Sequence, residues 1–171
     1  KMKRTVHIET IIRILKNWKK NLDSNLSAFT YGSNSFDCFP SVLCPISQIV
    51  NPVADFMEMA SGAYHPFERE KDFMDFGKRI MDFAIWFDVA KKNMIIGIEK
   101  NITLPRCIAD QTLHQLKSLK KSKEYLKPVN ETKLSNGNVY VKRYKTMMVE
   151  VFQKNLSDFV LFFEKEYLPK C

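Results

Sequence analysis

Apolar side chains recur along this chain three and four residues apart, in several separate stretches. The first stretch is residues 6–22, where six apolar positions fall on one side of a helix: Ile8, Ile11, Ile12, Leu15, Trp18 and Leu22. That spacing is typical of an amphipathic helix with one face against a core. We therefore expect a helix over residues 6–22. Residues 24–45 lose the period and collect Ser, Asn, Gly and Pro, which indicates a long loop.

The longest periodic stretch begins at Pro66 and continues to about residue 95. One apolar stripe comprises Phe73, Phe76, Ile80, Phe83, Ala84 and Phe87, and a second set extends it around the cylinder, namely Met81, Ile85, Trp86 and Val89. A helix that is apolar on most sides is expected to be enclosed by other elements. The sequence therefore predicts a long central helix over residues 66–95, with Gly97 ending it.

Helix boundaries elsewhere are indicated by proline and by N-cap residues. Asn51 before Pro52 is typical of an N-cap followed by proline at the first helical position, and predicts a short helix. Leu104-Pro105 opens the next helix, and Lys127-Pro128 is expected to close it.

The last expected helix carries one apolar face and stops at Leu168-Pro169. That face comprises Tyr144, Met148, Val151, Phe152, Phe159 and Phe163. Before this helix, Asn136-Gly137 precedes three β-formers, so a small β-hairpin near residues 133–141 stays open as an alternative. The chain of 171 residues shows no repeat and no linker. We expect a single domain over residues 1–171, an all-α helical bundle of about five helices around the long central one.

Composition supports a globular protein and excludes several classes. Hydrophobic residues make up 45% and charged residues 27%, which is too apolar for a disordered chain. No run of 18 uncharged apolar residues occurs, so no transmembrane segment is expected. The first ten residues, KMKRTVHIET, lack the apolar core of a signal peptide. They indicate either a processed mature form or a piece of a longer protein.

Charge is concentrated at the two ends of the chain. The formal net charge is +8, with +6 in residues 1–20, −4 in residues 21–64, zero in residues 65–110 and +6 in residues 111–171. Such a distribution favours an acidic partner, whether a protein, a glycan, a membrane surface or a nucleic acid. The lysine-rich stretches KSLKKSKEYLK and VKRYK carry no reader motif, so nucleic acid is the weaker alternative. We expect partner contacts at Lys117, Lys120, Lys121, Lys123, Lys142, Arg143 and Lys145.

Residues for catalysis or metal binding are scarce. The three histidines fall in different elements, and neither a G-x-S-x-G motif, a glycine-rich phosphate loop nor H-E-x-x-H occurs. Asp110 and His114 are four residues apart, but Glu-x-x-His partners for a di-metal site are missing, so a solvated surface pair is favoured. We expect no enzyme activity, no cofactor, no metal and no small-molecule substrate.

The four cysteines allow a disulfide interpretation. If the helices that begin at Pro105 and end at Leu168 are antiparallel, Cys107 and Cys171 lie at the same end of the bundle. That pairing leaves Cys38 and Cys44 for a small loop, whose C-x5-C spacing is too loose for the usual zinc motif. In the alternative, all four cysteines are small buried hydrophobes.

Glycosylation sequons point to the same compartment as disulfides. N-x-[ST] occurs at Asn25, Asn101, Asn130 and Asn155, and we expect glycans at Asn101 and Asn130 because both fall in predicted loops. Asn155 is expected to point between Phe152 and Phe159, where a glycan would prevent packing. Together the sequons and cysteines favour secretion over a cytoplasmic or nuclear location.

Two resemblances agree with a secreted helical protein. The layout of amphipathic helices, long connections and four cysteines resembles the helical cytokines in outline. The stretch GKRIMDFAIWFDVAKKNMI, residues 77–95, resembles a segment of the gastropod sperm lysins, which are basic helical proteins of the acrosome. No functional residue is transferred from either group.

Two function hypotheses follow from these observations. The first is a secreted, disulfide-linked bundle that binds an acidic protein or glycan through basic helix faces. The second is an intracellular helical interaction module from a larger protein, which docks a partner helix or peptide in an apolar groove. The second predicts free thiols and an exposed apolar patch near Trp86 or along the last helix.

Overall fold

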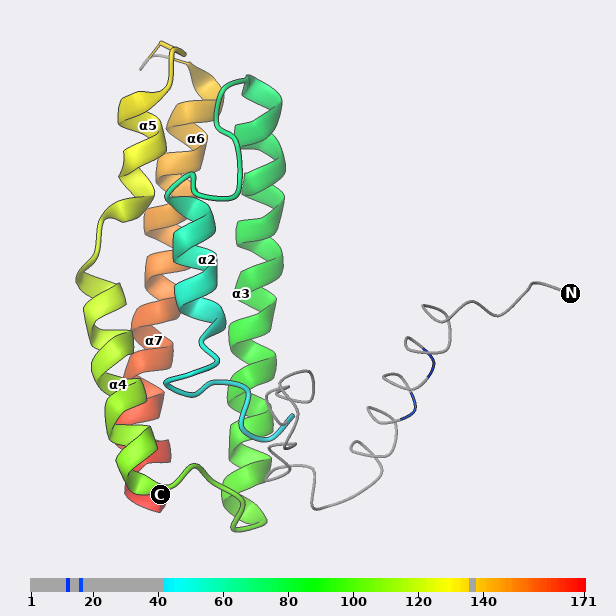
Figure 1. The fold of residues 1–171 in the computed structure, drawn as a ribbon, viewed down its shortest axis with the longest axis vertical. Helices are drawn as coiled ribbons and strands as arrows, with labels where there is room; N and C mark the ends of the chain where they lie inside the picture. Colours follow the sequence, from blue (N-terminus) through cyan, green and yellow to red (C-terminus); the bar gives the residue numbers. More distant parts are fainter. Residues whose placement is uncertain (1–11, 13–15, 17–41, 136–137) are drawn as a thin grey trace, which may run out of the picture.

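The computed structural model describes residues 12, 16, 42–135 and 138–171 (Figure 1). The helical elements in order are α2 (Pro52–Ala60), α3 (Glu70–Glu99), α4 (Arg106–Lys121), the 3-10 turn η1 (Glu124–Leu126), α5 (Lys127–Glu131), α6 (Val139–Met147), the π-helical η2 (Met148–Gln153), α7 (Lys154–Phe162), the π-helical η3 (Phe163–Tyr167) and the 3-10 turn η4 (Leu168–Lys170). These ranges contain no strand. The all-α prediction is therefore confirmed for the described part of the chain.

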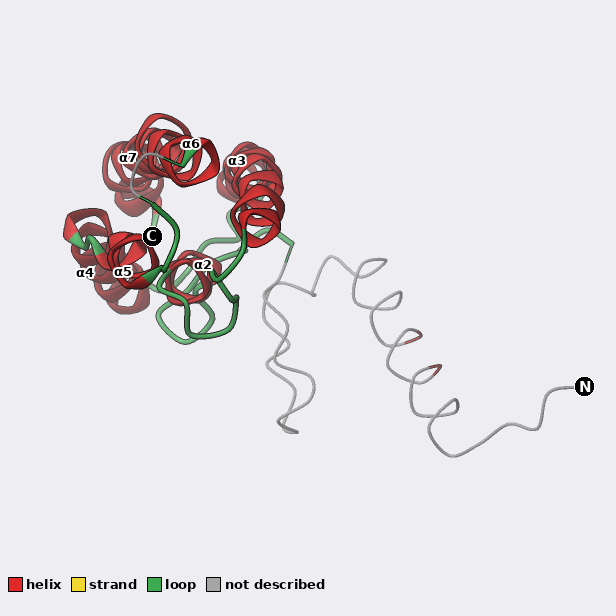
Figure 2. Ribbon diagram, turned by 90° about the horizontal axis from the view of Figure 1, so that it is seen from above, coloured by secondary structure: helices red, strands yellow, loops and turns green. Residues whose placement is uncertain are grey.

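The described helices form an antiparallel bundle. In Figure 1, α2 rises, α3 descends, α4 and α5 rise, and α6 and α7 descend. Seen from above, α3, α2, the α4–α5 column and the α6–α7 column surround a common interior (Figure 2). The helix expected over residues 6–22 lies outside the described residues, apart from Ile12 and Lys16, both of which are helical.

An aromatic cluster fills the interior between α2, α3 and the last column. Phe56 of α2 lies against three phenylalanines, with ring centroids 5.3 Å from Phe76, 4.3 Å from Phe83 and 5.0 Å from Phe152. Tyr144 of α6 meets Phe76 from the other side at 5.7 Å. Offset and tilted rings at these separations contribute more than their buried area alone. The aromatic residues of the predicted stripe are therefore the ones that hold the columns together.

α3 is a side of the bundle and not its enclosed centre, so that part of the prediction is wrong. Phe73, Phe76 and Phe87 are buried, as the stripe predicted. Met81, Ile85 and Val89, however, are exposed by 50%, 63% and 47%. Because only α2 and the α6–α7 column flank α3, apolar residues on its third side have no partner among the described residues.

The N-cap prediction for α2 is confirmed. The Asn51 side-chain oxygen accepts from the backbone N–H groups of Val53 and Ala54, both at 3.2 Å, and Pro52 lies in the first turn. These contacts satisfy N–H groups that a helix start leaves without partners. This N-cap could be predicted from the sequence because its hydrogen bonds join residues within three positions of each other.

The long helix begins and ends later than predicted, because α3 covers Glu70–Glu99 and contains Gly97. Two further boundary predictions are wrong. Val139, Tyr140 and Val141 form the first turn of α6 in place of a hairpin arm, with Asn138 as N-cap accepting from the Tyr140 N–H at 2.9 Å. Lys127-Pro128 begins α5 in place of closing α4. Helical phase explains the first error, since Val141 lies three residues before Tyr144 and both are buried.

Candidate interaction surfaces

The basic residues expected to bind a partner are divided between two places. Lys117 of α4 is half-buried, and its Nζ lies 2.6 Å from Oε1 of Glu164 in η3. Lys117 is the main cause that lowers the pKa of the Glu164 carboxyl, with smaller effects from Lys165 and Lys120. Lys120 and Lys121 are exposed in the last turn of α4, and Lys123 is exposed just after this helix. Lys117 is therefore engaged within the bundle.

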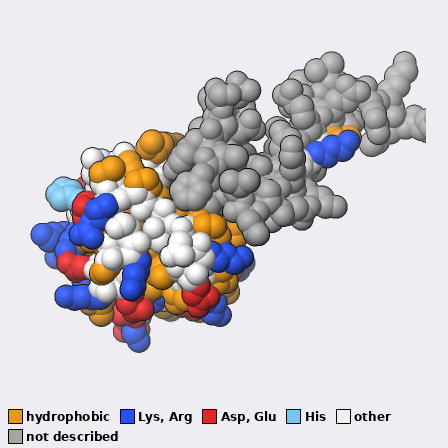
Figure 3. All heavy atoms as spheres, turned by 90° about the horizontal axis from the view of Figure 1, so that it is seen from below, with side chains coloured by type: hydrophobic (Ala, Val, Ile, Leu, Met, Phe, Trp, Pro, Cys, Tyr) orange, Lys and Arg blue, Asp and Glu red, His pale blue; other side chains and the backbone are white. Residues whose placement is uncertain are grey.

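The basic residues of α6 lie near the other end of the last column. Lys142 and Arg143 are exposed and Lys145 is half-buried. Arg143 precedes Glu164 by 21 residues, so about 30 Å of helix separates Arg143 from the Lys117 pair. At the opposite, lower end of the bundle, cationic and anionic side chains are interspersed (Figure 3). The structure does not join the seven predicted residues into one surface.

An apolar stripe follows the outer side of α3, in the helix that contains Trp86, near which the interaction-module hypothesis expected an exposed apolar patch. We call Met74, Met81, Ile85, Val89 and Ile96 the α3 stripe; these side chains are exposed by 42%, 50%, 63%, 47% and 39%. At 100° per residue they fall within an arc of about 80° on the helix. The exposed Lys78 and Lys92 fall within the same arc and divide the α3 stripe along its length. Exposed apolar residues that lie together, such as Met81, Ile85 and Val89, mark interaction sites more often than scattered residues do. The sequence indicated this stripe, because the apolar residues of α3 occupy a wider arc of the helix than the neighbouring helices bury.

A methionine-lined cleft adjoins the upper end of the α3 stripe, between α3 and α6. It has a volume of about 260 Å³. Its lining comprises Phe73, Met74, Gly77, Lys78, Met81, Tyr140, Arg143, Tyr144 and Met147. Lys78 and Arg143 are the charged members of this lining, and both are basic. The cleft therefore combines an apolar wall with a positive rim.

The floor of the methionine cleft is fixed by Tyr144. Its hydroxyl lies 3.1 Å from the carbonyl oxygen of Ala60 and 2.8 Å from that of Tyr125. Burial raises the pKa of Tyr144, so the hydroxyl keeps its proton and acts as the donor. One phenol thus connects α6 to the end of α2 and to η1.

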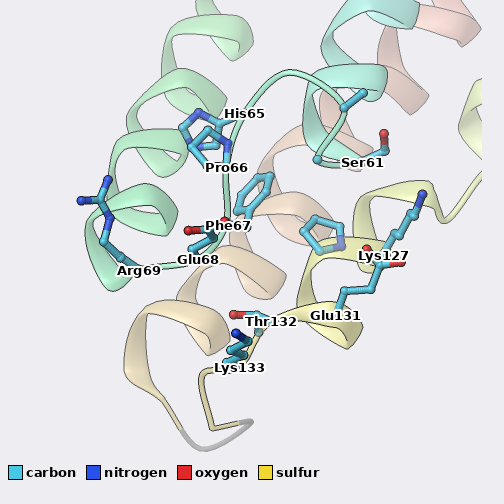
Figure 4. Close-up of a pocket in the computed structure, with 13 residues that line it drawn as sticks. Ser61, His65, Pro66, Phe67, Glu68, Arg69, Lys127, Glu131, Thr132 and Lys133 are labelled. Carbon is cyan, nitrogen blue, oxygen red and sulfur yellow. The ribbon is translucent and has the colours of Figure 1, made fainter.

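A larger pocket of about 630 Å³ opens at the upper end of the bundle, between the α2–α3 loop and α5 (Figure 4). Phe67 lies on its loop side. Asp72 holds that loop in place, accepting from the N–H groups of Arg69 at 2.9 Å and Glu68 at 3.2 Å. The Arg69 N–H is the main cause that lowers the pKa of Asp72. The charged lining has both signs, with Arg69, Lys127 and Lys133 against Glu68 and Glu131, so charge does not select a ligand for this pocket.

The described cysteines are free, so the predicted Cys107–Cys171 disulfide is not present. The two bundle ends do meet as expected, since the Leu104 N–H donates to the Tyr167 hydroxyl at 2.9 Å. Cys107, however, is exposed on the face of α4 opposite the buried Ala109. The Cys171 thiol instead donates to the Tyr167 carbonyl oxygen at 3.4 Å.

The other half of the disulfide prediction is only partly described. Cys44 is buried, with its Sγ 3.7 Å from the Tyr167 hydroxyl, and burial raises the pKa of its thiol. Cys38 lies outside the described residues. The surroundings of Cys44 match the alternative interpretation, in which the cysteines are small buried hydrophobic residues.

The sequons have different environments. Asn101 is exposed in the turn after α3 with a positive φ of 55°, which asparagine tolerates better than most residues. Asn130 is also exposed but lies within α5, where a loop was expected. Asn155 is half-buried and its Nδ2 donates to the Val151 carbonyl at 2.8 Å. Asn25 lies outside the described residues, and glycosylation stays a prediction.

Metal and membrane sites are not found in the described ranges. Among residues 42–135 and 138–171, with Ile12 and Lys16, His, Cys, Asp and Glu side chains form no group of three or more that would hold a metal ion. In the same part of the chain, every helix is too short or too polar to cross a bilayer. Comparisons with protein-family models, curated proteins and solved structures found no match to this chain. Any functional proposal therefore depends on the surfaces described above.

Proposed function

We propose that this protein is a non-catalytic binding module whose methionine cleft holds the apolar side chains of an acidic amphipathic helix from a partner protein. The observation that carries the proposal is the open, methionine-lined cleft between α3 and α6 with Lys78 and Arg143 on its rim. Free thiols and an exposed apolar patch are also the two features that the interaction-module hypothesis predicts.

Methionine suits such a site because its unbranched side chain adapts to the shape of a ligand. Met74, Met81 and Met147 line the cleft from both helices. A helix laid along α3 would present residues at i, i+3, i+4 and i+7 to the cleft and stripe. Each large apolar side chain that becomes buried there stabilises the complex by about 1.5–3 kcal/mol before ordering costs.

The rim charges favour a partner with carboxylates beside its apolar face. Arg143 is exposed, and a guanidinium binds a carboxylate through two parallel hydrogen bonds. Lys78 is 69% exposed and already lies 3.1 Å from Asp75, so its contribution is expected to be the smaller one. The proposal keeps the acidic partner of the first hypothesis, but its carboxylates would bind Arg143 and not the lysines of α4.

A second copy of the chain fits the α3 stripe less well. Two antiparallel α3 helices crossing at Ile85 would match apolar residues, because Met81 would face Val89 and Met74 would face Ile96. The same register places Lys78 opposite Lys92 and Asp82 opposite Asp88, which are like-charge pairs. A partner of complementary charge avoids this repulsion.

The test is binding of a synthetic probe to the full chain. The probe is an 18-residue fluorescein-labelled peptide with leucine at helical i, i+3, i+4, i+7 positions and glutamate elsewhere, measured by fluorescence anisotropy. We expect saturable binding that Met81→Lys weakens at least tenfold and Arg143→Glu also weakens. Leu161→Lys is the matched control, because Leu161 is 57% exposed on α7, outside the cleft lining.

Methionine methyl NMR locates the probe directly. With ¹³C-methyl methionine, binding is expected to shift the signals of Met74, Met81 and Met147 and to leave Met94, which is fully buried, unchanged. A peptide with lysine in place of glutamate should bind at least tenfold more weakly. Equal binding of both peptides, or equal loss in Met81→Lys and Leu161→Lys, would refute the proposal.

The basic-face hypothesis is tested in the same assay. Charge reversal at Lys120 and Lys121 removes two exposed cations of α4 without touching the cleft. If probe affinity at low salt is unchanged, α4 takes no part in binding. If it falls as far as in Arg143→Glu, the partner site extends to α4 and the cleft proposal is wrong as stated.

A further inference from the structure

The methionines of the described residues differ widely in their access to solvent. Met81 and Met74 line the methionine cleft and are exposed by 50% and 42%. In contrast, Met57, Met94 and Met148 are core residues, exposed by 3%, 0% and 0%. A dissolved oxidant must reach the sulfur to react with it, so oxidation follows exposure. The most accessible thioethers in the described part of the chain are therefore those of the cleft.

The remaining methionines of the described ranges, Met59 and Met147, are half-buried. The Met147 sulfur packs on Gly77, 3.3 Å from the position that a Cβ on this glycine would occupy. The Met59 sulfur accepts a hydrogen bond from Nη1 of Arg79 at 3.4 Å. Because both sulfurs have close protein neighbours, we expect them to be oxidised more slowly than those of Met74 and Met81.

Oxidation at the exposed positions would change the cleft without unfolding the bundle. When hydrogen peroxide reacts with a thioether, its O–O bond breaks, one oxygen bonds to the sulfur and the other leaves as water. The sulfur loses two electrons to the peroxide and becomes a polar sulfoxide. At Met94 that oxygen would lie in the apolar core, whereas at Met74 and Met81 it stays in water. Lys78 is four residues from Met74 and three from Met81, the spacing at which helix side chains meet, so its ammonium group is placed to donate to either oxygen.

We propose that Met74 and Met81 are sites of reversible oxidation by peroxide, and that their oxidation releases the helix held in the methionine cleft. This inference rests on the proposed function, because the sulfoxides act on the apolar side chains of that helix. A partner side chain that packs on a thioether would cover the sulfoxide oxygen and remove its water. Methionine sulfoxide reductases reverse the step: a dithiol is oxidised to a disulfide, and the oxygen leaves as water.

The test combines mass spectrometry with the fluorescein-labelled peptide probe. The full chain is treated with increasing hydrogen peroxide, and the sulfoxide at each methionine is measured in peptide fragments. Among the described methionines, we expect Met81 and Met74 to react first, about tenfold faster than the buried Met57, Met94 and Met148. Once both are converted, probe affinity should fall about tenfold or more, as expected for loss of one apolar contact. The circular dichroism spectrum should be unchanged, and reductase treatment should restore binding.

Matched variants separate methionine oxidation from other effects of peroxide. Met74→Leu with Met81→Leu keeps the apolar volume and has no sulfur at either site, so its probe affinity should survive the same treatment. Met81→Gln has a polar side chain of similar length and should bind the probe weakly without peroxide. If the leucine variant loses binding on treatment, another group, such as the exposed Cys107 thiol, is responsible and the proposal is overturned.

Two kinds of failure are distinguished by the affinity before treatment. If untreated protein binds the probe and the doubly oxidised protein binds it equally well, this inference is wrong and the proposed function stands. The same conclusion follows if the buried methionines are oxidised as fast as Met74 and Met81. If untreated protein does not bind the probe, the proposed function is refuted, and this inference with it.

Discussion

Gly97 is the position where the structure predicts the reverse of what helix propensity predicts. Glycine inside a helix costs about 0.5–1 kcal/mol relative to alanine, so Gly97→Ala should stabilise an isolated α3. In the folded protein, a Cβ on residue 97 would lie 2.6 Å from the carbonyl oxygen of Ile102 and 3.2 Å from that of Leu43. Both atoms are backbone, so neither can rotate away. Ile102 is held in a turn, because its own N–H donates to the Gly97 carbonyl oxygen at 2.8 Å.

The expected size of the effect follows from these opposing contributions. Forcing a methyl group into a packed site costs about 1–3 kcal/mol, from which the propensity gain is subtracted. We expect Gly97→Ala to lose about 1–2 kcal/mol of unfolding free energy. For a chain of this length that corresponds to a fall in Tm of about 2–8 °C. Urea and thermal unfolding followed by circular dichroism measure both quantities.

Gly77→Ala is the matched control on the same helix. There the nearest atom to a new Cβ is the Met147 sulfur at 3.3 Å, the end of a flexible side chain. We expect Gly77→Ala to be neutral or to gain up to about 1 kcal/mol. If Gly97→Ala is as stable as the wild type, the close approach of Leu43 and Ile102 to α3 is refuted. If both variants lose stability equally, the distinction between backbone and side-chain contacts is wrong.

Three further predictions concern a hydroxyl, a carboxylate and the thiols. Tyr144→Phe leaves two buried carbonyl groups without their donor and should cost about 1–2 kcal/mol in urea unfolding; no loss would contradict the hydrogen bonds. Asp72→Asn should destabilise at pH 7. The Asp72 pKa is lowered in the fold, so its contribution is present above the unfolded pKa of about 4 and disappears as pH falls through the folded value. The gap to wild type should therefore narrow as pH falls below about 4, and a constant gap would refute this origin. With iodoacetamide at pH 8, the exposed Cys107 should react first among the three described cysteines; burial raises the pKa of Cys171 to about 11 and also raises that of the buried Cys44, so both should react more slowly. Fewer than four alkylatable cysteines in the unfolded, unreduced protein would support the disulfide hypothesis.

The local features of this fold were predictable from sequence. Asn51-Pro52 began a helix where expected, because an N-cap needs only its own next three residues. The start of α4 and the end of the last column met as the antiparallel argument predicted, with Leu104 bonded to Tyr167. The positions of residues around α4 also argued against the Cys107–Cys171 disulfide. Cys107 is two residues from the buried Ala109, or about 200° around the helix.

Features that depend on neighbours were not predictable in the same way. Val139-Tyr140-Val141 has high β propensity, but Tyr144 bonds to two carbonyl groups in other helices and draws the segment into α6. Tertiary contacts override a preference of this size. Arg143 was expected to contact the same partner as the lysines of α4. It lies instead against α3, because its helical position puts it on the same edge of α6 as Tyr140 and Met147.

The sequence by itself determined that the described part of this protein is helical, that Phe73, Phe76 and Phe87 face the interior, and that a helix begins at Asn51-Pro52. These properties follow from periodicity and from contacts within a few residues. Only the tertiary structure decided that α3 leaves one side uncovered. The apolar arc of a helix shows how much of its surface burial would stabilise. The number of neighbouring helices decides how much of that surface is buried. The exposed α3 stripe is the difference between those two quantities.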